Sequence, residues 1–415
     1  MVTKSSPELA LTDDDGGQNR NLIAHQPDES WPVYDEDEIG AVVEVLRSGR
    51  VNQWTGPHVT AFEDACSRRF GCGRAIALAN GSVALELALR AFGVGIGDEV
   101  IVTPRSFIAS ASCVKLVGAT PVFADVDQDS GNLTANSISQ VLSERTRAII
   151  PVHLAGWPTD VPAMIDLVRG RDVKIIEDCA QAHGAEINRQ SVGSFGDAAA
   201  FSFCQDKIIS TGGEGGLLTL RDEAAWEWAW SFKDHGKDFA KSTTPSADPG
   251  TFRWVHERIG TNWRMTGPQA ALGLAQLEKL DDWRSARTRN AEIWAAALMR
   301  VHGLRVPLPV ANLQRHAFYK LYFYIDGGAD DEASELRSEI LRRSAAEELR
   351  VFSGSCSEIY RERAFAGLST ANCPVARSLG ARSLMVEVHP TLRPELLELR
   401  AERVARIAAD VLGKA

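Results

Sequence analysis

An acidic side chain and a lysine follow two apolar runs near the middle of this 415-residue chain. Asp178 comes just after the run 173–176, and Lys207 comes four residues after the run 198–203. Short apolar runs are typical of buried strands, so both side chains are expected just past the carboxyl ends of strands, where open α/β sheets bind ligands. An acid and a lysine held there suit a cofactor that has a basic ring nitrogen and an aldehyde. Pyridoxal phosphate is that cofactor.

Two glycine-containing segments flank the same predicted site. Asn80-Gly81-Ser82 separates a predicted strand, 75–79, from a predicted helix, 83–92. A glycine and a hydroxyl at a helix N-terminus leave free backbone N–H groups, which a phosphate monoester needs, although an ordinary N-cap has the same residues. The run 212–216 is rich in glycine and gives the backbone the freedom to bring a following strand, 217–220, against the site.

Several spaced motifs agree in order with those of one enzyme family. They are Glu177-Asp178-Cys179-Ala180-Gln181-Ala182-His183-Gly184, Phe201-Ser202-Phe203 with Lys207 four residues on, Thr211-Gly212-Gly213-Glu214-Gly215-Gly216, and Ile259-Gly260-Thr261-Asn262-Trp263-Arg264-Met265. With these motifs the chain resembles the DegT/DnrJ/EryC1/StrS sugar aminotransferases, which are pyridoxal-phosphate enzymes of the aspartate aminotransferase fold, type I. The resemblance runs from about Trp31 to the C-terminal helix.

The resemblance implies that Lys207 forms the internal aldimine with pyridoxal 5'-phosphate. A carboxylate at Asp178, within hydrogen-bond reach of the pyridine nitrogen, keeps that nitrogen protonated, and a charge-assisted bond of this kind contributes about 1.5 to 3 kcal/mol. In this family a histidine in place of the lysine marks a change of chemistry away from transamination. The lysine of this chain implies that transamination is retained.

The remaining cofactor contacts are also implied by the resemblance. Phe107 stacks on the pyridine face, Gln181 lies beside the ring hydroxyl, and the phosphate is held by Gly81, Ser82, Ser202 and, from the neighbouring subunit of a homodimer with shared active sites, Asn262. Taken alone, Phe107 is more typical of plain core. His183 could serve beside the ring hydroxyl, but a lone histidine after a strand is more often a satisfied packing residue. Glu177 points to the other face of its strand and is expected to be structural.

The resemblance further implies a keto-sugar substrate, most typically a nucleotide-linked keto-6-deoxyhexose, with glutamate as amino donor. Basic and aromatic residues fall in segments that are expected to ring the cofactor and to grip a diphosphate: Arg50, Trp54, Lys233, His235 and Lys237. The alternative is that these are solvated loop charges. A keto-cyclitol such as an inosose is the rival substrate, and a non-catalytic regulator that keeps the fold is the rival function.

Composition excludes several other classes. The net charge of -10 and the pI near 5.5 argue against a nucleic-acid partner, whereas a small anionic ligand needs only a local positive site. The chain has no apolar run of 18 residues and no basic-then-apolar start, so we expect a cytoplasmic protein without a membrane partner. Seven cysteines at scattered spacings form no Cys-x-x-Cys pair and predict neither a metal site nor a disulfide.

The elements needed to position these residues predict an α/β protein. Strands expected at 99–102, 121–126 and 148–152 alternate with helices, which favours a mostly parallel sheet, seven-stranded in the related fold, between helices. A smaller C-terminal α/β domain follows. We predict a disordered extension over residues 1–30, a large cofactor-binding domain over 31–280 and a small domain over 281–415, with a surface loop at 241–250.

Overall fold

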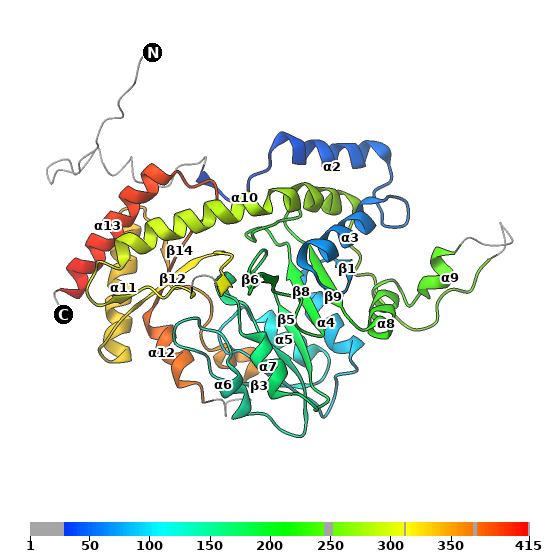
Figure 1. The fold of residues 1–415 in the computed structure, drawn as a ribbon, viewed down its shortest axis with the longest axis horizontal. Helices are drawn as coiled ribbons and strands as arrows, with labels where there is room; N and C mark the ends of the chain where they lie inside the picture. The colour runs from blue at the N-terminus through cyan, green and yellow to red at the C-terminus, as the bar shows by residue number, and fades with distance from the viewer. Residues whose placement is uncertain (1–28, 245–251, 311–312, 368–371, 414–415) are drawn as a thin grey trace, which may run out of the picture.

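The computed structural model describes residues 29–244, 252–310, 313–367 and 372–413 (Figure 1). Nearly all of the segment 1–30, predicted to be disordered, lies outside the described residues, as does most of the predicted loop 241–250. The first three residues of that loop are helical rather than irregular, because α9 (Phe239–Thr243) is capped by the side chain of Asp238. The loop prediction is therefore wrong at its start.

A seven-stranded sheet forms the centre of the molecule, in the strand order β1-β9-β8-β5-β4-β2-β3. Neighbouring strands are parallel except at β9, which runs antiparallel to both β1 and β8. The predicted α/β architecture with a mostly parallel seven-stranded sheet is confirmed. The strands are β1 (Arg74–Leu78), β2 (Glu99–Val102), β3 (Thr120–Phe123), β4 (Thr146–Ile150), β5 (Lys174–Asp178), β8 (Ala198–Ser202) and β9 (Gly216–Leu220).

Helices cover both faces of this sheet because each strand is apolar on both sides. In β1, Ile76 and Leu78 pack in one core cluster, and Ala75 and Ala77 pack in another, as the period of two requires. The helices on the first face are α4 (Gly81–Ala91), α5 (Ala109–Leu116) and α8 (Glu223–Lys233). Those on the other face are α3 (His58–Phe70), α6 (Ala135–Ser139), α7 (Val161–Leu167) and α10 (Gly267–Leu298), and α2 (Glu36–Ser48) packs on α10.

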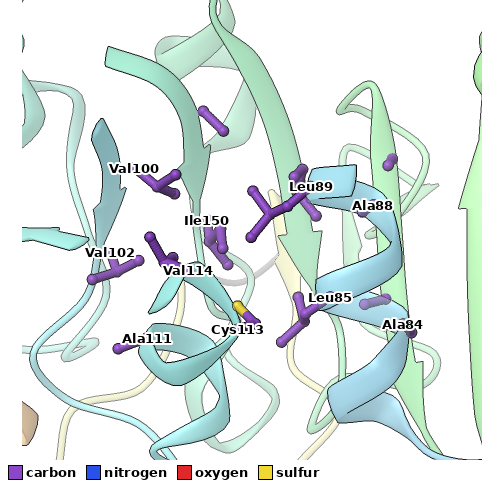
Figure 2. Packing of buried hydrophobic residues seen from close by; sticks show 14 of the residues in the cluster. Ala84, Leu85, Ala88, Leu89, Val100, Val102, Ala111, Cys113, Val114 and Ile150 are labelled. Atoms are coloured by element: carbon purple, nitrogen blue, oxygen red, sulfur yellow. The ribbon is translucent and has the colours of Figure 1, made fainter. Parts of the chain in front are cut away.

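Figure 2 shows how α4 is fixed on the sheet. Leu85 and Leu89, one turn apart, lie on the side of α4 that is turned toward Cys113 of α5 and Ile150 of β4, within one core cluster. Both leucines are at most 3 % exposed, and full burial of such a side chain contributes about 1.5 to 3 kcal/mol each. The start of α4 is thereby held at a defined height over the sheet. Two tryptophans of α8, Trp226 and Trp230, are also ordinary core residues.

A second, antiparallel sheet follows in the C-terminal part, in the order β10-β12-β14-β13. Its strands are β10 (Leu304–Arg305), β12 (Leu321–Ile325), β13 (Val351–Phe352) and β14 (Ser383–Val386), and its helices are α11 (Asp330–Ala346), α12 (Pro374–Arg382) and α13 (Pro394–Leu412). Three short strands that the sequence does not indicate form a further small sheet: β6 (Glu186–Ile187), β7 (Gln190–Ser191) and β11 (Gln314–Arg315).

The helix α10 joins the two sheets and runs along the molecule between them (Figure 1). Its first half packs in the core of the large sheet through Leu277 and Leu280, and its second half packs in the core of the small sheet through Trp294 and Leu298. The predicted domain division after residue 280 falls inside this helix and stays a prediction. No helix within the described residues has both the length and the apolarity needed to cross a membrane.

Candidate active site

The start of α4 and the end of β8 approach each other so closely that only glycine fits. A Cβ atom on Gly81 would lie 2.7 Å from the Cβ of Ser202, and one on Gly216 would lie 2.3 Å from the carbonyl carbon of Asn80. The Asn80 side chain caps α4 by accepting one backbone N–H of its first turn. The amides of Gly81 and Ser82 have no intrahelical acceptor, so this end offers N–H donors and hydroxyls to an anion, and it fits a phosphate group.

Asp178 ends β5 and lies in the same row of strand ends. Its Oδ2 accepts a hydrogen bond of 2.8 Å from the Ser110 hydroxyl, and its Oδ1 accepts one of 3.1 Å from the Ala180 amide. Burial raises the pKa of Asp178, and the hydrogen bonds and the charge of Lys207 offset this only in part. A carboxylate can accept about four hydrogen bonds, so Asp178 keeps capacity for a cationic ring N–H.

Lys207 lies in the turn after β8. Its Nζ is 3.8 Å from Oδ1 of Asp206 and 4.9 Å from the centre of the Tyr319 ring, and its carbonyl accepts a hydrogen bond of 2.8 Å from the Trp31 indole. Sequence reasoning missed all three neighbours, and it missed Ser110 as the partner of Asp178. Tyr319 lies 112 residues after Lys207, and nothing in the sequence indicates that the two come together.

Gln181 lies in the turn that follows β5, and Phe107 lies just before α5, the helix whose Ser110 contacts Asp178. The Oε1 of Gln181 accepts a hydrogen bond of 2.7 Å from the amide of Ala155, which fixes the side chain. The Phe107 carbonyl accepts from the amide of Ser110, so Phe107 sits one turn before the residue that contacts Asp178. Phe107 is 66 % exposed, and the interpretation that it is plain core is wrong. An exposed ring at this point has a free face for a flat ligand.

His183 packs among aromatic rings rather than facing the site. Its ring stacks at 5.4 Å on Phe203 and 6.0 Å on Phe201. Neither ring nitrogen has a hydrogen-bond partner among the described residues, so the expectation of a satisfied packing residue is only half right. Burial, and then the charges of Lys207 and Arg287, lower the pKa of His183 to about 3, so the ring is neutral.

Glu177 faces away from Asp178, as the strand period requires. It accepts hydrogen bonds from Nε2 of His153 at 3.1 Å and from the amides of Gly193, Phe195 and Gly196 at 2.7 to 2.8 Å. Nδ1 of His153 accepts from the Thr159 amide, so Nε2 is the ring nitrogen that donates to Glu177. Glu177 is a structural residue that ties together the loop following β7.

The two segments expected to bind the substrate diphosphate, around Trp54 and around Lys237, contact each other. Part of their charge is paired within the protein. Nζ of Lys237 lies 4.2 Å from the Trp54 ring centre and 3.1 Å from Asp234. Lys233 is fully buried and bonds Gln53 at 2.6 Å, so the prediction that it contacts a ligand is wrong. Its charge is balanced within the protein by Asp234, at 3.5 Å.

Other predicted residues of this group are open to solvent. Arg50 and His235 are exposed, and His235 has a left-handed backbone with φ of 58°. Asn262 is exposed and pairs across a β-bridge with Asp234. The segment that holds it continues alongside the end of β1, where the Ala79 amide donates to the Trp263 carbonyl at 2.9 Å. The segment that holds Asn262, although distant in sequence, therefore lies beside the residues that precede α4.

The fold and the row of strand-end residues define a pyridoxal-phosphate-dependent transferase of fold type I. The model of the DegT/DnrJ/EryC1/StrS aminotransferase family matches residues 32–405, and the chain belongs to this family. It is therefore a pyridoxal-phosphate-dependent aminotransferase. Membership in an aminotransferase family argues against the rival interpretation as a non-catalytic regulator.

Three relatives illustrate the match. An aminotransferase from Psychrobacter cryohalolentis has a solved structure that is 43 % identical and superposes with a TM-score of 0.85, covering 93 % of this chain and 98 % of that one. GDP-perosamine synthase of Escherichia coli O157:H7 is 30 % identical over 91 % of this chain and 99 % of its own length. A putative L-glutamine:3-amino-2,3-dideoxy-scyllo-inosose aminotransferase of Streptoalloteichus tenebrarius is 33 % identical over 73 % of this chain and 71 % of its own length.

Proposed function

We propose that Lys207 bonds the cofactor covalently and moves the substrate proton, and that Asp178 holds the ring nitrogen. One observation carries this proposal: the lysine and the buried carboxylate follow two neighbouring parallel strands and are close enough for the charge of Lys207 to lower the pKa of Asp178. The close approach of Gly81 to Ser202 supports a phosphate site at the same edge.

Each residue then has a physical task. Pyridoxal phosphate, when bound, supplies a ring that accepts the electron pair released as the substrate loses its α-proton. Asp178 would accept a hydrogen bond from the protonated ring nitrogen, Lys207 would take and return the proton at Nζ, and Phe107 would cover the flat face and exclude water. Gln181 orients the ring hydroxyl. The phosphate is held by Gly81, Ser82 and Ser202, with Asn262 of the second subunit.

The substrate we propose is a nucleotide-linked keto-(6-deoxy)sugar, with glutamate as the amino donor. The relationship to GDP-perosamine synthase supports a nucleotide sugar. Arg50, Trp54, His235 and Lys237 are the residues we assign to its diphosphate and sugar, because they are basic or aromatic and none of them is buried, and Lys237 contacts the Trp54 ring. A diphosphate needs a few such donors, which a neutral cyclitol does not.

Incubation of the cofactor-loaded protein with glutamate and a panel of keto-sugar nucleotides, with the products followed by mass, tests this assignment. We expect amination of at least one nucleotide sugar. Lys237→Ala should raise KM for that substrate and leave the glutamate half-reaction nearly unchanged, since it removes a charge that only the diphosphate needs. Equal losses in both half-reactions would contradict the assignment of Lys237.

The second candidate is amination of a keto-cyclitol. The inosose aminotransferase among the relatives supports it, as does the internal pairing of Lys233 and Lys237, which leaves fewer free charges for a diphosphate than the sequence indicates. Efficient amination of a free inosose, together with no turnover of any nucleotide sugar, would select this candidate.

The active unit we propose is a cytoplasmic homodimer with shared active sites. Asn262 supports this, because it is exposed and belongs to a motif that related enzymes use across the interface. Mixing inactive Lys207→Ala protein with inactive Asn262→Ala protein should restore activity, since some mixed dimers regain one intact site. No recovery after verified subunit exchange would contradict shared sites.

A further inference from the structure

Two side chains next to Lys207 have no task in the proposed mechanism. The Tyr319 hydroxyl donates a hydrogen bond to Oδ2 of Asp206, and the other oxygen of that carboxylate, Oδ1, lies 3.8 Å from Nζ of Lys207. One oxygen is thus held by the phenol, and the other faces the amino group. The carboxylate cannot turn toward Lys207 with both oxygens without breaking the tyrosine hydrogen bond.

Tyr319 also contacts the lysine directly. Nζ of Lys207 lies 4.9 Å from the centre of its ring, within the range of a cation–π contact. A second ammonium group, that of Lys320, is 5.3 Å from the same ring but is ion-paired with Glu387 at 3.2 Å. One tyrosine therefore holds Lys207 through its ring and the partner of Lys207 through its hydroxyl.

The backbone of Tyr319 is fixed from two sides. Its amide donates to the Ala155 carbonyl at 2.9 Å, and Nη1 of the buried Arg287 donates to its carbonyl at 3.3 Å. Ala155 and Phe318 both have left-handed backbones, with φ of 56° and 46°. Such a conformation costs a residue other than glycine on the order of 1 to 3 kcal/mol and persists only where the surroundings enforce it.

The same anchor reaches the cofactor side of the site. The Ala155 amide donates to Oε1 of Gln181 while its carbonyl accepts from Tyr319. Tyr319 lies two residues before β12, and β12 pairs with β14 in the small sheet. A shift of the small sheet would therefore move Tyr319 and, through it, the loop that carries Lys207.

The charge states suit this arrangement. Burial raises the pKa of Asp206, but the charge of Lys207 and the tyrosine hydrogen bond outweigh it, so the net pKa is below the ordinary value and the group is an anion. Burial and the nearby carboxylate raise the pKa of Tyr319, so its hydroxyl stays protonated and remains a donor.

We propose that Asp206 and Tyr319 are a pair of positioning residues that keep the free amino group of Lys207 beside the site, so that it can bond and release the cofactor quickly. The inference rests on the proposed role of Lys207. A lysine side chain has a flexible four-carbon stem, and without a fixed partner its amino group samples many positions. Misplacement of a reacting group by about 1 Å slows a step by roughly 10²-fold.

The test compares Tyr319→Phe, Asp206→Asn and the double variant with wild type. Asp206→Asn keeps an acceptor for the tyrosine and removes the charge that faces Lys207. Tyr322→Phe is the matched control, because Tyr322 is 9 % exposed against 7 % for Tyr319 and its hydroxyl bonds Ser355 instead. Two quantities are measured on the apoenzyme: the rate of covalent capture of pyridoxal phosphate by absorbance, and the Kd of pyridoxamine phosphate, which binds without the lysine bond.

We expect both single variants to slow capture by roughly 10- to 100-fold, with the Kd of pyridoxamine phosphate changed less than about threefold. The double variant should be no slower than the slower single one, because the pair acts as a unit, and the control should match wild type. Unchanged capture rates, or equal losses in capture and in pyridoxamine phosphate binding, would overturn the inference. Cofactor found on another lysine of the wild type would instead overturn the proposed function.

Discussion

The two sides of β5 bury a carboxylate each, and the surroundings of these carboxylates differ in chemistry. Behind the strand, Glu177 accepts four hydrogen bonds, one from His153 and three from amides of the loop 193–196. Burial raises its pKa, but these donors outweigh burial and bring the pKa below its ordinary value. The charge of Glu177 is fully balanced by the protein, so nothing is left for a ligand to contact.

In front of the strand, Asp178 accepts only two hydrogen bonds, from Ser110 and Ala180, and its pKa is raised because burial dominates. Adjacent residues of equal depth therefore have opposite pKa shifts. The number of hydrogen-bond donors around a buried carboxylate therefore separates a structural acid from one that can still bind a cation. The following predictions test this contrast.

Asp178→Asn should have the largest effect. The amide cannot hold the ring nitrogen in its protonated state, so we expect kcat to fall by roughly 10²- to 10³-fold, the loss typical of one preorganised electrostatic contact. The apoenzyme should be at least as stable as wild type, since an under-satisfied buried charge is removed. Steady-state kinetics and thermal unfolding check the two statements; a large loss of stability would mean that Asp178 is structural as well.

Glu177→Gln should give the opposite pattern. The neutral side chain leaves backbone N–H groups of the loop 193–196 under-satisfied, and we expect a loss of about 3 kcal/mol in the free energy of unfolding. The folded fraction should keep kcat within a few-fold of wild type, because Glu177 faces away from the site. Urea unfolding combined with active-site titration measures both. A stable but inactive variant would break the comparison.

The pH dependence of apoenzyme stability should separate the two acids further. The pKa of Glu177 is lowered from 4.5, so its contribution is present above pH 4.5 and is lost as the pH falls through the folded pKa. The pKa of Asp178 is raised from 3.8, so its contribution is present below pH 3.8 and is lost as the pH rises through the folded pKa. The contribution of each group changes by at most about 1.4 kcal/mol per pH unit.

Unfolding between about pH 2 and pH 8 is the corresponding measurement, because both titrations then fall within the range. As the pH rises, wild type loses the contribution of Asp178 and Asp178→Asn does not, so the variant should become more stable relative to wild type. As the pH falls, wild type loses the contribution of Glu177 and Glu177→Gln does not, so the free energy of unfolding of this variant should fall less than that of wild type. Parallel curves for the two variants would show that the donors around the carboxylates do not set the difference.

Ser110→Ala should have the smallest effect. It removes one of the two hydrogen bonds to Asp178. A hydrogen bond to a charged acceptor contributes about 1.5 to 3 kcal/mol in the apoenzyme, and in the loaded enzyme the bound ring partly replaces it. We therefore expect a few-fold change in cofactor affinity, measured by equilibrium dialysis, and little change in kcat. A loss as large as that of Asp178→Asn would show that Ser110 contacts the reacting atoms.

Much of this site could be predicted from the sequence because the signals are local. The period-two alternation separates Glu177 from Asp178, and a short apolar run followed by Lys207 predicts a strand end without knowledge of the rest of the chain. The large sheet was predictable for the same reason. The role of each cofactor residue came from the family resemblance rather than from spacing.

The remaining features depend on contacts between distant segments. Tyr319 meets Asp206 across 113 residues, and Ser110 meets Asp178 across 68, so no local pattern indicates either pair. The sequence indicates an exposed basic residue at Lys233, but this lysine is buried and its amino group donates a hydrogen bond to Gln53 in another loop. Charge in a sequence indicates a need for a partner and does not say whether that partner is a ligand or the protein itself.

Borohydride reduction of the cofactor-loaded enzyme, followed by peptide mapping, identifies the lysine that bonds the cofactor. We predict that the reduced cofactor is found on Lys207 alone, and that Asp178→Asn still carries it there. Label on any other lysine, Lys233 and Lys237 included, would contradict the assignment of the strand-end site.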